Sequence, residues 1–90
     1  MEDKNFDTLC RNLSKQVKAA RQQADLSQEA LALAAEVDRS YVSQLERGLA
    51  NPSLQILHRL AQALGHDLRI TFVPPAKNPS ADNKDSKTQQ

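Results

Sequence analysis

The sequence predicts an all-α fold, a compact bundle of four to five helices followed by a short C-terminal β-strand. Three observations lead to this prediction. Apolar residues recur at helical spacing through most of the 90-residue chain. Aromatic residues make up only 3% of it, so the core depends on leucine, valine, isoleucine and alanine, two of which are the strongest helix formers. Within residues 67–75, Leu68, Ile70 and Phe72 alternate with Arg69, Thr71 and Val73, which is the period of a strand with one buried face.

The first predicted helix begins near Leu9, and residues 1–8 are expected to lead into it. Its apolar residues follow one another at steps of four and three, which places them along one face. They are Leu9, Leu13, Val17, Ala20 and Ala24. The basic residues of its other faces, among them Lys15 and Lys18, are interpreted as a solvated surface.

Three shorter helices are predicted to follow within residues 9–66. Ser27, Asp38 and Ser53 are expected to cap their N-termini, because short polar side chains satisfy the free backbone N–H groups there. Gly48 and Gly65 are expected to end the third and fourth predicted helices.

The segment 67–75 is predicted to be a strand that mediates dimerisation. Leu68, Ile70 and Phe72 share one of its faces, and two prolines end it. No other segment is predicted to be a strand, so its backbone groups need a partner outside the chain. A second copy can supply this partner, which predicts a two-fold homodimer; the rival is a dimer through the fourth predicted helix. Residues 76–90 are expected to form a disordered tail.

Composition argues against several classes of protein. No apolar run approaches the roughly 20 residues of a membrane span, and the N-terminus is polar, so a cytoplasmic protein without membrane contact is expected. The single cysteine, Cys10, excludes an internal disulfide and a multi-cysteine zinc site. No nucleophile with a base, paired carboxylates or phosphate-binding glycine loop is present, so neither an enzyme nor a cofactor or metal site is predicted.

The second and third predicted helices are short and joined by a tight turn, as in a helix-turn-helix. Small Ala32 would let them approach closely, while Val37, Val42 and Leu45 would fill the wedge between them. The matching stretches are LSQEALALAAEVDRSYVSQLERG and NPSLQILHRLAQALG. Through these stretches, from about Leu9 to Gly65, the chain resembles the lambda-repressor and Cro-like (XRE-like) helix-turn-helix family. The resemblance implies a sequence-specific double-stranded DNA-binding transcription regulator, in particular a repressor. The predicted two-fold dimer would make its operator an inverted repeat.

The resemblance also implies roles for individual residues. The ninth motif position, often glycine because the turn favours a positive φ, is Glu36 here. Arg21 and Glu46 take the places of a partly buried ion pair. The base-reading positions fall on Gln28, Arg39, Ser40 and Gln44, since arginine can grip guanine and glutamine adenine through paired hydrogen bonds. Phosphate or additional DNA contacts are implied for Tyr41, Ser43, Arg47 and Asn51.

Two further properties bear on what the resemblance implies. Basic and acidic residues balance at nine each up to Pro75, so any DNA affinity must come from the placement of charge. The appended strand also resembles that of the HipB-type antitoxins, where it pairs across the dimer. The alternative is therefore an antitoxin that binds a protein toxin and represses its own operon.

Overall fold

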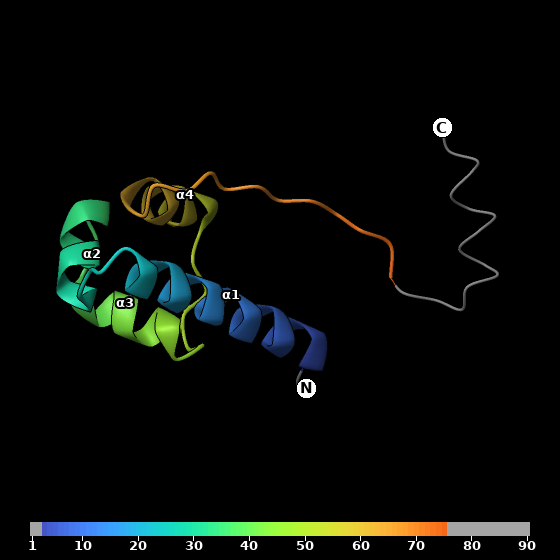
Figure 1. Ribbon diagram of the computed structural model, residues 1–90. Coiled ribbons are helices and arrows are strands. Elements are labelled where there is room, and N and C mark those ends of the chain that lie inside the picture. The colour runs from blue at the N-terminus through green and yellow to red at the C-terminus, as the bar shows by residue number, and fades with distance from the viewer. Residues whose placement is uncertain (1–2, 76–90) are drawn as a thin grey trace.

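The computed structural model describes residues 3–75, and the expected disordered tail, residues 76–90, lies outside them. The described chain forms four α-helices: α1 (Lys4–Gln23), α2 (Gln28–Ala35), α3 (Arg39–Glu46) and α4 (Leu54–Ala63). α2 packs on both α3 and α4, while α1 packs on α3. Figure 1 shows α3 and α4 on opposite sides of the long α1. The all-α prediction is confirmed, and none of the described helices is long and apolar enough to cross a membrane.

The start of α1 corrects the predicted boundary at Leu9. The helix begins at Lys4 because the Asp3 carboxylate accepts hydrogen bonds from the backbone N–H groups of Asn5 and Phe6, at 3.0 and 3.2 Å. Most of the segment expected to lead into the helix is therefore helical. This N-terminal end of α1 extends beyond α3 and α4 (Figure 1), which leaves Phe6 and Leu9 exposed.

The other helix ends lie close to their predicted positions. The Ser27 hydroxyl accepts from the Ala30 N–H at 2.9 Å, and Ser53 caps α4 in the same way. Asp38 occupies the N-cap of α3, but its side chain makes no capping hydrogen bond. Gly48 and Gly65 follow α3 and α4 with φ of 76° and 73°, the left-handed conformation in which helices commonly end.

One face of α3 packs against the hydrophobic core. Val42 and Leu45 of α3 are fully buried, and Ala32 of α2 and half-buried Val37 lie beside them, as the wedge prediction requires. The buried apolar cluster draws on every described helix and comprises Val17, Leu31, Ala32, Ala35, Val42, Leu45 and Leu60. Because this cluster covers only one face of α3, the opposite face remains in solvent.

The turn between α2 and α3 confirms the expectation of a non-glycine residue at positive φ. Glu36 adopts φ 62° and ψ 46°, in the left-handed region. Its N–H bonds to the carbonyl of Leu33 at 3.2 Å, which closes the end of α2. A side chain in this region costs about 1–2 kcal/mol through the clash of Cβ with the backbone.

Glu36→Gly is therefore expected to stabilise the protein. After the larger conformational entropy of glycine in the unfolded chain is subtracted, the gain is about 0.5–1 kcal/mol. The midpoint of thermal unfolding should rise by roughly 2–8 °C. Glu29→Gly is the matched control, since it places glycine in the right-handed first turn of α2 and should lower the midpoint. An unchanged or lowered midpoint for Glu36→Gly would contradict strain at this turn.

The segment after α4 is extended and forms no strand within the described residues. Its apolar side chains are largely uncovered, and Phe72 is 96% exposed. Leu68 and Ile70 line an apolar groove together with Leu9, Leu13 and Leu57. The predicted pairing needs a second copy, so the dimer strand stays a prediction.

Candidate nucleic-acid interface

The solvent side of α3 gathers the polar side chains that the sequence analysis singled out. Residues three and four apart share a helix face, so Arg39, Ser43 and Arg47 form one row, with Ser40 and Gln44 beside it. We call these five residues the reading face. All are exposed except half-buried Ser43. The reading face therefore presents guanidinium, hydroxyl and carboxamide groups to solvent on the side of α3 opposite its buried residues.

Two further predicted contact residues flank the reading face. Tyr41 is half-buried, and burial raises the pKa of its hydroxyl. Asn51 is exposed in the loop between α3 and α4. Residues 3–75 hold no group of His, Cys, Asp and Glu side chains arranged to bind a metal ion.

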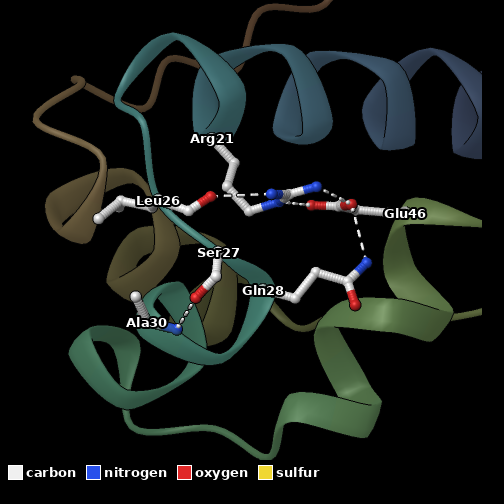
Figure 2. A network of polar contacts seen from close by, with 6 residues as sticks. All are labelled: Arg21, Leu26, Ser27, Gln28, Ala30 and Glu46. Carbon is white, nitrogen blue, oxygen red and sulfur yellow. Dashed lines mark hydrogen bonds and ion pairs between the residues drawn. The ribbon is translucent and has the colours of Figure 1, made fainter.

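An ion pair between α1 and the end of α3 fixes the reading face (Figure 2). The Arg21 guanidinium donates from Nε to Glu46 Oε2 at 2.6 Å and from Nη2 to Oε1 at 2.9 Å. The two side chains are only 12% and 3% exposed. Arg21 also donates from Nη1 to the carbonyl of Leu26 at 2.8 Å, in the loop before α2. One side chain therefore joins α1, this loop and α3, and the doubly bonded geometry restricts their orientation.

Gln28 differs from the other predicted base-reading residues because its side chain bonds within the protein. Its Nε2 donates to Glu46 Oε1 at 3.1 Å, which ties the start of α2 to the same carboxylate. The carbonyl oxygen of Gln28 points away from Glu46 (Figure 2). That oxygen and the second amide hydrogen keep the capacity to bond to DNA. Sequence spacing gave no sign of the contact with Glu46, which lies 18 residues further along the chain.

The protonation of Glu46 responds to these neighbours. Burial raises the pKa of its carboxyl, but hydrogen bonds from Arg21 and Gln28 and the positive charges of Arg21 and Lys18 outweigh burial. The net effect holds the pKa of Glu46 below its usual value. The hydrogen bond to Glu46 raises the pKa of Arg21 against the opposing effect of burial. The pair is therefore fully charged at neutral pH.

This lowered pKa predicts acid sensitivity. A carboxylate whose pKa is lower in the folded state stabilises the fold above its unfolded pKa, about 4.3 for glutamate, and loses that contribution as pH falls through the folded pKa. Glu46→Gln cannot titrate, so its stability deficit relative to the parent should shrink between roughly pH 5 and 3. Urea unfolding of both proteins from pH 7 to 3 measures the difference between their free energies of unfolding. The other carboxylates are common to both proteins, so their titration cancels in this difference. A stability deficit of Glu46→Gln that does not change with pH would contradict the Arg21–Glu46 ion pair.

Comparison with known proteins agrees with this geometry. A helix-turn-helix family model matches residues 17–69. The chain is 30% identical over 74 residues to an uncharacterized HTH-type transcriptional regulator, YqaF, of Bacillus subtilis, covering 82% of this chain and 97% of that protein. It is 42% identical over 53 residues to the immunity repressor protein of Bacillus phage phi105, covering 59% and 37%. The crystal structure of the restriction-modification controller protein C.AhdI from Aeromonas hydrophila is 37% identical, with a TM-score of 0.65, covering 67% and 91%.

The fold and the reading face thus define a helix-turn-helix protein. The chain belongs to the helix-turn-helix family, and its resemblance to the XRE-like branch is confirmed. It spans nearly all of YqaF but only 37% of the phage repressor.

Proposed function

We propose that the protein is a cytoplasmic transcription regulator that binds a specific double-stranded DNA operator and represses from it. The observation that carries the proposal is the reading face, an exposed polar face on a helix anchored by the Arg21–Glu46 pair. A helix of this size fits the major groove, where base edges carry a distinct pattern of donors and acceptors. The named relatives are a regulator, a repressor and a controller protein, which favours a repressor over an antitoxin.

In this proposal the contacts divide by what they recognise. Arg39, Ser40 and Gln44 contact base edges, and Gln28 approaches from the start of α2. A second set of residues contacts phosphates, which position the protein and carry no sequence information, or adds further DNA contacts. These residues are Tyr41, Ser43, Arg47 and Asn51.

Selection of bound sequences from random duplex DNA tests the proposal. A two-fold dimer presents two reading faces, so the enriched sequence should be an inverted repeat with half-site centres about 34 Å apart or a multiple of this spacing. Failure to enrich any sequence would overturn sequence-specific recognition.

The same proposal includes a homodimer formed through residues 67–75. Their extended backbone has no ladder partner within the described chain, and unpaired strand edges favour pairing with another strand. Leu68 and Ile70 already lie beside α1 and α4 in the apolar groove. Antiparallel pairing about a two-fold axis would cover this groove in both copies.

Ile70→Asp is expected to weaken the dimer because it places a carboxylate on the face that pairing would bury. Loss of a buried isoleucine costs about 1.5–3 kcal/mol, so the dissociation constant should rise tenfold or more. Val73→Asp is the matched control, since it adds the same charge to an exposed residue of the same segment that does not line the groove. Light scattering over a concentration series measures both. Equal dimerisation of the two variants would refute the strand and favour the rival interface through α4.

A further inference from the structure

We propose that a cationic row on α1 binds DNA phosphates beside the bases that α3 contacts. The row consists of Arg11, Lys15 and Lys18, and we call it the α1 row. The inference rests on the proposed function and extends the DNA-binding surface beyond the helix-turn-helix itself. It revises the interpretation of Lys15 and Lys18 as a solvated surface.

The α1 row lies beside the end of α3 and the residues that follow it. Its members are exposed and follow one another at steps of four and three, so they share one helix face. The neighbouring flank of α1 faces α3, because Ser14 is buried there and Arg21 bonds to Glu46. A methyl group on Gly48, directly after α3, would lie 4.0 Å from the Arg11 Cγ and the Ser14 Oγ. At the other end, the charge of Lys18 helps to lower the pKa of Glu46. The row therefore lies beside the chain from Glu46, the last residue of α3, to Gly48.

The charges of the row are only partly offset within the described protein. Residues 3–75 contain one ion pair, Arg21–Glu46, and no side chain of the α1 row takes part in it. Asp7, the acidic residue of the first turn of α1, lies one turn before Arg11 and away from both lysines. Like charges at these spacings destabilise a helix by about 0.2–0.5 kcal/mol per pair. An anionic partner outside the chain would relieve this repulsion.

The length of the row suits a DNA strand. Arg11 and Lys18 are seven residues apart, about 10 Å along an α-helix. One strand of duplex DNA carries a phosphate about every 3.4 Å along its axis, so the row can face two or three phosphates. The row and the reading face together carry five positive side chains, while total charge is nearly balanced. DNA affinity then follows from the placement of charge.

The salt dependence of binding tests this inference with the full-length protein. The logarithm of the binding constant falls linearly with the logarithm of salt concentration, by about 0.9 for each phosphate contacted. Lys15→Gln with Lys18→Gln should reduce this slope by about 0.9 per lost contact on random duplex DNA. The ratio of operator to random affinity should stay unchanged, and thermal unfolding should show that the variant folds.

A relocated charge provides the matched control. Lys15→Gln combined with Gln62→Lys keeps the net charge but moves one positive side chain to the exposed surface of α4. It should lose about 0.9 from the slope, because one phosphate contact is removed. A parental slope in the double variant would overturn the α1 row, as would parental binding by the relocated-charge variant. If either of these results is found while the parent still enriches an operator, only the α1 row is overturned. If the parent binds no DNA, the proposed function is overturned as well.

Discussion

Glu46→Ala is expected to destabilise the fold by about 3 kcal/mol, the lower end of the range for breaking a buried ion pair. The substitution leaves the Arg21 guanidinium, only 12% exposed, without the acceptor of two of its hydrogen bonds. Gln28 loses its partner as well. For a domain of this size each kcal/mol lowers the midpoint of thermal unfolding by about 4–8 °C, so a fall of roughly 12–24 °C should be measured by circular dichroism.

A double-mutant cycle isolates the contact itself. Arg21→Ala should also be strongly destabilising, and the double variant should lose less than the sum of the single losses, because either substitution alone already removes the interaction. Glu29→Ala is the control, since this exposed acid in the first turn of α2 should contribute no more than about 1 kcal/mol through the helix dipole. Strictly additive losses would show that the two side chains do not interact.

Arg39→Ala and Gln44→Ala are expected to lower the ratio of operator to random affinity. A good two-bond contact to a base discriminates by about 1–3 kcal/mol, so each variant should lose roughly 5- to 150-fold in this ratio. Arg47→Ala, one turn beyond Ser43 at the end of α3, should weaken binding to both DNAs about equally, because phosphate contacts are independent of sequence.

Binding titrations on the selected operator and on random duplex measure these ratios. Gln62→Ala on the exposed surface of α4 is the control and should match the parent on both DNAs. If the ratio is unchanged in both Arg39→Ala and Gln44→Ala, the reading face is wrongly assigned. A ratio that falls with Arg47→Ala would instead move base recognition to the end of α3.

The parts of the fold that could be predicted depend on nearby residues. Ser27 bonds to a backbone N–H three residues further on, and Gly48 ends α3 by its own φ, so both effects are visible in a few positions. The start of α1 was missed because its apolar stripe begins at Leu9, whereas the capping residue is Asp3. Periodicity also shows which face of a helix is apolar but not whether another element covers it. Leu9 fits its stripe and yet is 63% exposed.

The candidate site was predictable only in part for a related reason. The residues of the reading face lie on one short helix, so their common face follows from helical spacing. The contact of Gln28 with Glu46 and that of Arg21 with the Leu26 carbonyl depend on how α1, α2 and α3 pack. The same packing places Lys18 near Glu46, and no local pattern distinguishes such a lysine from an ordinary solvated one.

The most direct test of the reading face repeats the selection from random duplex DNA with Gln44→Ala and compares its enriched sequence with that of the parent. One side chain in each copy of a two-fold dimer should specify one position in each half-site. The account predicts that base preference is lost at a symmetric pair of positions and kept at the others. An enriched sequence identical to that of the parent would contradict base recognition by the exposed face of α3.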